Sequence, residues 1–258
     1  QAALRGPRRL AWDAAGNLYV STIQRVRRIS RDGIITTVAG NGETKFAGDG
    51  GYATDASFSF AEGVAVDADG NIYVSDWVDN RIRRITTDGI INTFAGDGEY
   101  RFAGDGGQAL KASLKSPAGL AFDLSGNLFV ADVNNRRVRK IGTDGTISTV
   151  AGDGNLGFTG DGGAAIGASL TFPHAVATDA AGNLLVADTQ NWRLRRISPE
   201  GIIQTLAGNG RYRAADDGAP ALDLYMNQPS GFTRDAQGNA YVADTLGHKV
   251  WKVSADGT

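Results

Sequence analysis

The sequence predicts an all-β fold made of five copies of one four-stranded antiparallel unit, and three observations support this. A Gly-Asn step recurs at near-constant intervals, at Gly16-Asn17, Gly70-Asn71, Gly126-Asn127, Gly182-Asn183 and Gly238-Asn239. Between these steps, apolar and polar residues alternate with a period of two, which is typical of strands. Glycine makes up 36 of the 258 residues. Without a collagen period, this share indicates many tight turns.

The second copy shows the predicted strands most clearly. They cover residues 63–67, 71–75, 81–85 and 90–95, with turn residues at 68–70 and 87–89. The fourth strands of the other copies are expected at 34–39, 146–151 and 202–207. Four antiparallel strands per repeat form the blade of a β-propeller. We expect no helix longer than a single turn, at 109–114 and 220–224.

We expect residues 1–258 to form a single propeller domain. The repeats span roughly 1–40, 41–96, 97–152, 153–208 and 209–258, and the fifth stops where its outer strand should begin. A five-bladed propeller is favoured, and an incomplete six-bladed one is the alternative. Because the chain begins with Gln1 rather than methionine, we also expect it to be processed or excised.

Composition excludes several classes of site. The chain has no cysteine and only two histidines, His174 and His248, so disulfides, thiolate metal sites and multi-histidine centres are excluded. The net charge of −2 argues against a domain built to neutralise nucleic-acid phosphates. No apolar run approaches the ~20 residues that a membrane-spanning helix needs.

The sequence motifs resemble those of a known family. Residues 117–139 read Pro-x-Gly-Leu-Ala-Phe-Asp, then Gly-Asn-Leu-Phe-Val-Ala-Asp, then Asn-x-Arg-Val-Arg. This pattern resembles the NHL repeat family, whose domains are β-propellers, and the resemblance covers essentially the whole chain. The connectors between repeats look like those of long-repeat NHL proteins in bacterial extracellular sequences. The resemblance implies an extracellular or periplasmic location and, most often, binding of a ligand or protein.

Three connectors share one glycine-rich motif. It reads Phe-x-Gly-Asp-Gly-Gly at residues 46–51, 102–107 and 158–163, whereas the last connector departs from it at 213–218. A phosphate-binding loop would need a following Gly-Lys-Ser/Thr, and a calcium loop would need more carboxylates. We therefore expect a structural turn anchored by a buried phenylalanine.

Residues that recur in every copy are expected to form the scaffold. One such column is basic and a second is acidic: Arg25, Arg81, Arg137, Arg193 and Lys249, and Thr22, Asp76, Asp132, Asp188 and Asp244. We expect them to close each blade through an ion pair or a bond from the Asp to the backbone. The basic third strands, such as 81–84 and 193–196, are expected to be solvated edges, because neighbouring strand residues face opposite sides. Nucleic-acid binding is therefore not expected.

A binding site is expected where the copies differ. The second-to-third loops and the long connectors should share one face, here called the connector face. At its centre, the residue that follows the proline position varies most, and the column reads Arg8, Glu62, Ala118, His174 and Ser230. The loops around it contribute Trp77, Asn135, Arg136, Trp192 and His248, and the irregular last connector contributes Tyr212, Asp216, Asp217 and Tyr225.

Each of these residues also has a purely structural interpretation. His174 could cap its strand, Glu62 and Arg8 could pair and close the mouth, and the tryptophans could pack on connector glycines instead of stacking on sugars. A His174–Glu62 acid–base pair is chemically feasible, but no nucleophile can be named. Because Glu62 is the one acid in the central column, we expect no metal or cofactor, with calcium as the alternative implied by propeller lactonases.

We therefore expect a binding propeller that recognises a small molecule, a glycan or a peptide through its connector face. An enzyme, either a hydrolase or a lyase working at the polar mouth, is the alternative. A structural repeat module of a larger protein is a further alternative. The sequence names no substrate and no partner.

Overall fold

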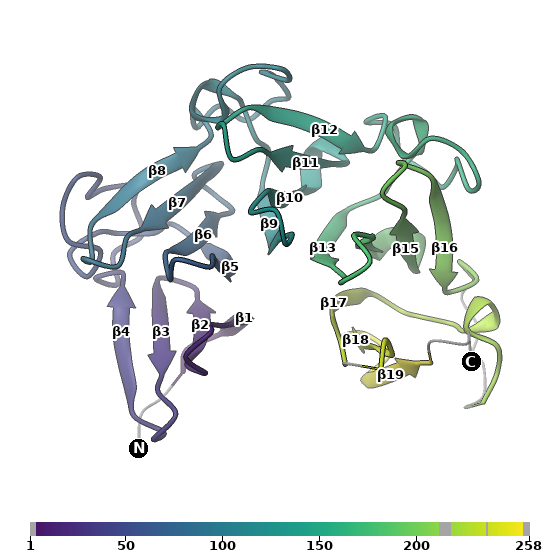
Figure 1. Cartoon of the computed structure of the whole chain (residues 1–258), viewed down its shortest axis with the longest axis horizontal. Helices are drawn as coiled ribbons and strands as arrows, with labels where there is room; N and C mark the ends of the chain where they lie inside the picture. The colour runs from purple at the N-terminus through teal and green to yellow at the C-terminus, as the bar shows by residue number, and fades with distance from the viewer. Residues whose placement is uncertain (1–3, 212–217, 236, 255–258) are drawn as a thin grey trace. The chain divides into compact units, whose positions relative to one another are not determined.

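The fold is a β-propeller of five antiparallel blades, seen in a computed structural model that describes residues 4–211, 218–235 and 237–254 (Figure 1). Four blades have four strands in the order first to fourth, and the fifth has three strands in its described residues. This confirms the predicted fold class. Five 3-10 turns, η1 to η5, are the helical elements of the described chain.

The strands follow the predicted ranges closely. Blade 1 consists of β1 (Pro7–Trp12), β2 (Leu18–Thr22), β3 (Arg25–Ile29) and β4 (Ile35–Ala39). Blade 2 consists of β5 (Ala61–Val66), β6 (Ile72–Asp76), β7 (Arg81–Ile85) and β8 (Ile91–Ala95). Blade 3 consists of β9 (Pro117–Phe122), β10 (Leu128–Asp132), β11 (Arg137–Ile141) and β12 (Ile147–Ala151).

The remaining blades repeat this order. Blade 4 consists of β13 (Pro173–Thr178), β14 (Leu184–Asp188), β15 (Arg193–Ile197) and β16 (Ile203–Ala207). Blade 5 consists of β17 (Pro229–Arg234), β18 (Ala240–Asp244) and β19 (Lys249–Val253). The two predicted helical turns are present as η1 (Ala109–Lys111) and η5 (Ala221–Asp223).

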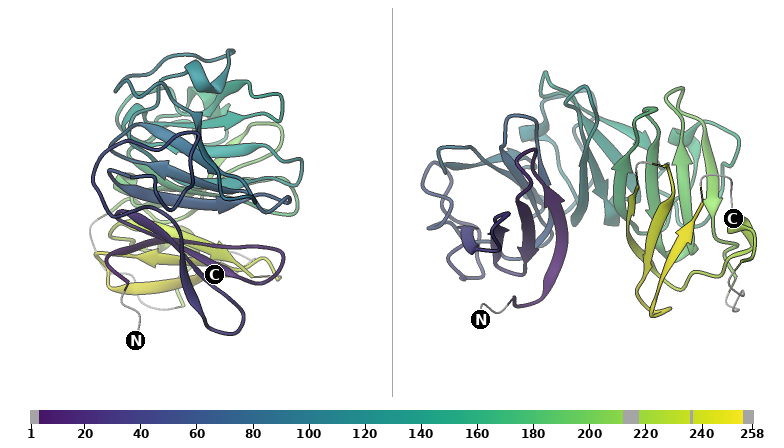
Figure 2. Two further views of the ribbon diagram at one scale, coloured as in Figure 1. Left: turned by 90° about the vertical axis from the view of Figure 1, so that its left-hand side faces the viewer. Right: turned by 60° about the horizontal axis from the view of Figure 1, so that its bottom comes forward.

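The chain divides into two compact units. Unit 1 comprises residues 1–130 and 141–148, and unit 2 comprises residues 131–140 and 149–258. In unit 1 the first strands of neighbouring blades pack together, β1 against β5 and β5 against β9. In unit 2, β13 packs against β17 in the same way, and Figure 2 shows these blades from two further directions.

An aspartate turn explains the repeated Gly-Asn step. In blade 2 the Asp67 carboxylate accepts hydrogen bonds from the Asn71 backbone N–H and side-chain amide, both at 2.8 Å. Gly70 between them has φ +87°, a conformation that glycine adopts without strain. The same pair of bonds joins Asp123 to Asn127. The step is therefore the hairpin turn between first and second strands.

A β-bulge near the start of the first strand places the variable column. In blade 2, Ala61 lies opposite Asp76 while Gly63 lies opposite Ser75, so Glu62 is the extra residue. Blades 4 and 5 have the same register shift, with His174 and Ser230 as the extra residues. A bulged residue leaves the regular side-chain alternation of the strand and re-aims its side chain.

Buried apolar side chains fill the space between neighbouring blades. One core cluster of unit 1 includes Phe58, Val74 and Ile91, all fully buried. In a second cluster of this unit, the Tyr73 ring meets Phe94 and Phe122 edge-on, with ring centroids 4.9 and 5.0 Å away. Such contacts keep each blade fixed against the next within a unit.

Candidate functional site

The aspartates of the acidic column accept hydrogen bonds from backbone N–H groups. This is one of the two predicted alternatives, the bond from the aspartate to the backbone. In blade 2, Asp76 accepts hydrogen bonds from the backbone N–H groups of Ser59 and Phe60 at 2.9 and 3.0 Å. In blade 4, Asp188 accepts one from Thr171 at 2.7 Å. Each aspartate thus fixes the end of the connector at the point where the next first strand begins.

Two arginines of the basic column bond to backbone carbonyl groups and not to the acidic column. Arg81 donates to the carbonyl oxygens of Asp79 and Asp97 at 3.1 and 2.8 Å, and Arg193 makes the equivalent bonds to Asn191 and Asn209. These arginines tie the second-to-third loop to the start of the connector. The cation that meets the acidic column is instead the arginine two residues later.

The prediction that the basic third strands are solvated edges was wrong for one arginine in each of three blades. Arg83, Arg139 and Arg195 are fully buried. Arg195 lies 3.2 Å from Asp188 and 2.8 Å from Asp161. Because a buried guanidinium must be paired, each of these three blades carries an internal charge cluster. The alternation of strand residues sends these side chains inward, and the sequence pattern alone does not say which of the two arginine sets faces in.

The phenylalanine of the connector motif is not buried as predicted. Phe46 and Phe158 are each 37% exposed. Their rings lie against arginines instead, with the Arg81 guanidinium 4.3 Å above Phe46 and that of Arg193 3.7 Å above Phe158. A cation on an aromatic face stabilises the connector while leaving the outer side of the ring in solvent.

The central column forms a charged cluster in unit 1. Glu62 is 2% exposed, and its carboxylate lies 2.7 Å from Arg8 Nε and 3.7 Å from Arg9. Burial lowers the pKa of Arg9, and the attraction of Glu62 opposes that change. The ion pair between Arg8 and Glu62 that the sequence suggested is therefore present. With two cations and one anion, the cluster keeps a net positive charge.

The Arg8 side chain is held in position on two sides. Its Nε donates to Glu62, and its guanidinium lies 5.0 Å from the centroid of the Phe60 ring. The side chain remains 40% exposed, and no described residue accepts a hydrogen bond from its two terminal amino groups. Trp77 is half-buried next to this cluster, and its backbone N–H donates to the Phe60 carbonyl at 2.9 Å. Arg8 is thus a pre-positioned cation beside aromatic surface.

Blade 1 also has a hollow on its connector face. Its second-to-third loop is short: two residues separate Thr22 from Arg25, whereas four residues separate Asp76 from Arg81 in blade 2. A pocket of about 430 Å³ lies at this loop, lined by Arg5, Gly6, Thr22, Ile23, Gln24 and Arg25. The replacement of aspartate by Thr22 makes this end of blade 1 more cationic than the same end of blade 2.

The predicted residues of unit 2 take similar positions in their own blades. His174 is a half-buried bulge residue, and the Ser230 hydroxyl hydrogen-bonds to that of Thr245. Trp192 is half-buried and His248 is exposed, and both have φ +53°. Asn80 and Arg136 share this left-handed conformation, so one backbone turn presents a different side chain in each of blades 2 to 5.

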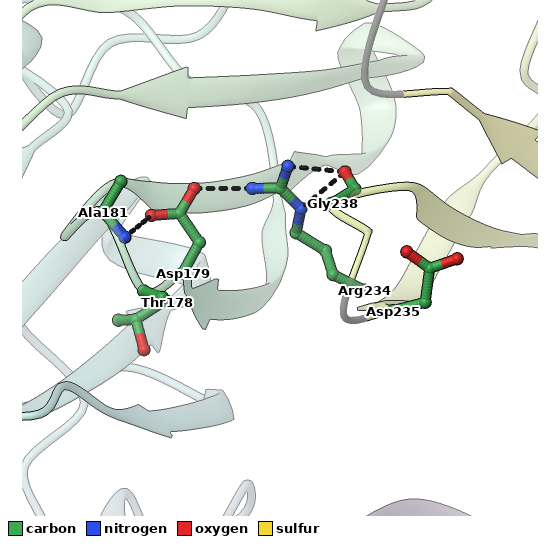
Figure 3. Close-up of a pocket in the computed structure, with 7 residues that line it drawn as sticks. Thr178, Asp179, Ala181, Arg234, Asp235 and Gly238 are labelled. Carbon is green, nitrogen blue, oxygen red and sulfur yellow. Dashed lines mark hydrogen bonds and ion pairs between the residues drawn. The ribbon is translucent and has the colours of Figure 1, made fainter.

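A second hollow lies at the opposite end of blades 4 and 5 (Figure 3). It has a volume of about 410 Å³ and lies at the turns that follow β13 and β17. The Arg234 guanidinium bridges it, donating to Asp179 at 2.5 Å and to the Gly238 carbonyl at 2.6 Å. The polar groups satisfy one another, so the arrangement is an inter-blade clamp.

Three residues of the predicted site cannot be placed. Tyr212, Asp216 and Asp217 lie outside the described residues. Within residues 4–211, 218–235 and 237–254, no three acidic or histidine side chains come together as metal ligands would. No helix in this described part is long and apolar enough to cross a bilayer.

Sequence reasoning missed Arg9, Phe60 and Arg234. Arg234 could have been found, because the corresponding positions of the other blades hold Trp12, Val66, Phe122 and Thr178, and a charge there breaks the column. Arg9 and Phe60 carried no such signal. They join the site because the bulge brings Glu62 toward the neighbouring first strand, which is a consequence of packing.

Comparison with known proteins agrees with the fold. The family model of the teneurin NHL domain matches residues 41–103 and 99–159. Teneurin-1 of Mus musculus is 31% identical over 224 residues, which is 77% of this chain and 8% of that protein. The chain therefore spans about 8% of the length of this relative.

Two solved structures show the same architecture. An auxiliary nutrient binding protein from Bacteroides thetaiotaomicron has a TM-score of 0.70 at 15% identity, covering 98% of this chain and 60% of the other. Virginiamycin B lyase from Staphylococcus aureus has a TM-score of 0.60 at 18% identity, covering 98% and 68%. At these identities the likeness shows the fold alone.

Proposed function

We propose that this chain, an NHL-repeat β-propeller, is an interaction domain whose connector face binds the carboxylate group of a ligand. The observation that carries the proposal is Arg8. Its Nε is held by the buried Glu62 at 2.7 Å, while its two terminal amino groups meet no acceptor in the described chain. A guanidinium held in this way presents two parallel N–H donors, which match the geometry of a carboxylate.

The surroundings of Arg8 favour such a ligand. Glu62 and Arg9 are buried or nearly so, and this holds Arg8 in one orientation before the ligand arrives, which reduces the entropy lost on binding. Phe60 and Trp77 supply half-buried aromatic surface, on which the apolar face of a sugar ring or a side chain can pack. Arg5 and Arg25, which line the adjacent hollow of blade 1, add positive charge.

The three ligand classes expected from the sequence, a small molecule, a glycan or a peptide, can all carry a carboxylate group. A uronic or sialic acid, an acidic peptide and a small carboxylic acid all present the group that Arg8 would bind. The teneurin relatives and the nutrient binding protein are consistent with an interaction domain. An extracellular or periplasmic location stays an expectation from the resemblance.

Calorimetric titration with matched acidic and neutral ligands tests the proposal. We expect glucuronic acid oligosaccharides, sialyl-lactose or Asp/Glu-terminated peptides to bind at least about tenfold more tightly than their neutral or amidated counterparts. Arg8→Ala should remove this preference and Arg8→Lys should restore part of it, because a lysine keeps the charge but not the bidentate geometry. Arg31→Ala, which removes an exposed arginine from the third-to-fourth turn of the same blade, serves as control.

Two results would contradict this function. Binding that does not depend on the carboxylate, or that survives in Arg8→Ala, would rule out Arg8 as the recognition group. Turnover of a bound ester, lactone or glycoside would instead support the enzyme alternative, and loss of that turnover in His174→Ala would place its chemistry in unit 2.

A further inference from the structure

The outer edge of a blade is covered by the connector that precedes it. In blade 2, the Gly50 N–H donates to the Ile91 carbonyl at 2.8 Å, and the Ile91 N–H donates to Gly51 at 3.0 Å. Blades 3 and 4 repeat both bonds, through Ile147 and Ile203. The Gly-Gly end of each Phe-x-Gly-Asp-Gly-Gly motif thus pairs with a fourth strand, and these three isoleucines are fully buried.

Side chains then fix the connector to the blade. The carboxylate of Asp49 lies 2.7 Å from the buried Arg83 and accepts a hydrogen bond from Thr93 at 2.6 Å. In blade 4, Asp161 makes the same two contacts with Arg195 and Thr205, at 2.8 and 2.6 Å. The receiving set of a blade therefore comprises an arginine, an isoleucine and a threonine.

Blade 1 has the complete receiving set but no connector among the described residues. Arg27, Ile35 and Thr37 occupy the positions of Arg83, Ile91 and Thr93, and their register is the same. Ile35 and Arg27 are only half-buried, and within the described residues the Arg27 side chain makes one hydrogen bond, a 3.4 Å contact to the Thr36 carbonyl. Figure 1 shows β4 as the edge strand of its sheet. No described residue pairs with its outward N–H and C=O groups, which are therefore open to an added strand.

Blade 5 shows that the receiving set changes when the connector changes. The preceding connector lacks the Phe-x-Gly-Asp-Gly-Gly motif, and the position of the buried arginine holds Trp251. Lys249 lies 4.7 Å from the Trp251 ring. In blade 5 the aromatic partner of this cation therefore comes from the blade itself, whereas in blades 2 and 4 it is the phenylalanine of the connector. Retention of Arg27, Ile35 and Thr37 in blade 1 therefore indicates a partner with the common motif.

We infer that the outer edge of blade 1 is a docking site for a Phe-x-Gly-Asp-Gly-Gly segment of another NHL repeat, lying outside residues 1–258. The segment adds along β4 as an extended strand, its aspartate pairs with Arg27 and Thr37, and its aromatic ring covers Arg25. A second copy of this chain is not the source, because all three of its motifs already cover blades 2, 3 and 4.

A peptide with the sequence of residues 98–114 tests the inference. Added to the whole chain, the fluorescently labelled peptide should bind with one-to-one stoichiometry, and hydrogen exchange at the Ile35 amide should slow. Arg27→Ala should weaken binding about tenfold or more, because the aspartate of the peptide loses a charged partner. A peptide with Asn in place of its aspartate should lose a similar factor.

Three controls separate the outcomes. The peptide is amidated at its C-terminus, and Arg31→Ala, which removes an exposed arginine of the same blade outside the receiving set, should leave its binding unchanged. The carboxylate titration of Arg8→Ala is a separate measurement, so failure of the carboxylate-binding proposal is distinguishable from failure of this one. Since a free peptide loses more entropy than a tethered one, the same segment is also joined to the N-terminus through a flexible linker. Absence of Ile35 protection in that fusion, or binding that survives Arg27→Ala, would overturn the inference. Self-association of the unmodified chain that protects Ile35 would overturn the assignment of the source.

Discussion

Blade 1 and blade 4 share their strand pattern but differ in how their charges are satisfied. In blade 4, Arg195 is fully buried between Asp188 and Asp161, whereas the equivalent Arg27 of blade 1 is half-buried with a single weak contact. Thr22 replaces the aspartate on the second strand, and no described connector covers β4. The same strand sequence therefore yields a closed charge cluster only where a connector and an aspartate complete it.

The largest effect is expected from the two equivalent arginines. Arg195→Ala should lower the free energy of unfolding by about 3–5 kcal/mol, because it leaves the buried Asp188 carboxylate without its cation. Arg27→Ala should cost about 1 kcal/mol or less, since its partners are few and exposed. Urea denaturation followed by tryptophan fluorescence measures both. An equal loss of unfolding free energy in the two variants would show that Arg27 and Arg195 do not differ in how their charges are paired.

The second effect is a pH dependence that blade 4 has and blade 1 lacks. Burial raises the pKa of Asp188 to about 6, against an ordinary value of 3.8. The folded state therefore binds more protons between pH 4 and 6, and the contribution of this group to stability falls as the pH rises through that window. The difference corresponds to on the order of 3 kcal/mol. Thr22 contributes nothing comparable.

Denaturation curves between pH 4 and pH 7 measure this dependence, with Asp188→Asn as the variant that should reduce its slope. Burial also raises the pKa of Asp76 in blade 2 to about 6, so the share of that group should remain. Asp179 provides an internal contrast. Burial opposes its ionisation, but hydrogen bonds from Asn183 and the charge of Arg234 outweigh burial and lower its pKa. Its stabilising contribution should therefore be lost only below pH 4. A variant that keeps the full slope between pH 4 and 6 would contradict the assignment to Asp188.

The smallest effect concerns the connector contact itself. Asp49→Asn should make the edge of blade 2 resemble that of blade 1, because it removes the charge that meets Arg83 while keeping the shape of the side chain. We expect a loss of about 1 kcal/mol, since the Asp49 side chain is 34% exposed. Hydrogen exchange at the Ile91 amide should speed up toward that of Ile35. Asp69→Asn, in an exposed turn, is the control and should change neither quantity.

The repeat pattern was enough to predict the architecture. The Gly-Asn step marks a hairpin turn because an aspartate four residues before the asparagine satisfies both its backbone and its side chain, an interaction contained within a few residues. Alternation with a period of two then gives the strands, and comparison of the copies gives the variable column that contains Arg8 and Glu62. These are local rules, so a single sequence carries them.

The structure corrected predictions that depended on side-chain direction. The sequence shows arginines at alternate positions of β7 and β15 but not which set turns inward, so Arg83 and Arg195 were predicted to be solvated. The Phe46 ring was predicted to be buried, but it is exposed and lies against Arg81. The sequence did not show this contact, because Arg81 belongs to the blade that follows the connector. Phe60 and Arg9 join the proposed site through a similar contact between neighbouring strands.

The sequence by itself thus determined the blades, their turns and the positions at which one blade differs from another. Only the tertiary structure decided which charges are paired, because pairing depends on the connector of one blade reaching the fourth strand of the next. Blade 1 makes the division clear: Arg27 has closely similar neighbours in sequence to its counterparts, and its environment differs because a contact from outside the blade is missing among the described residues.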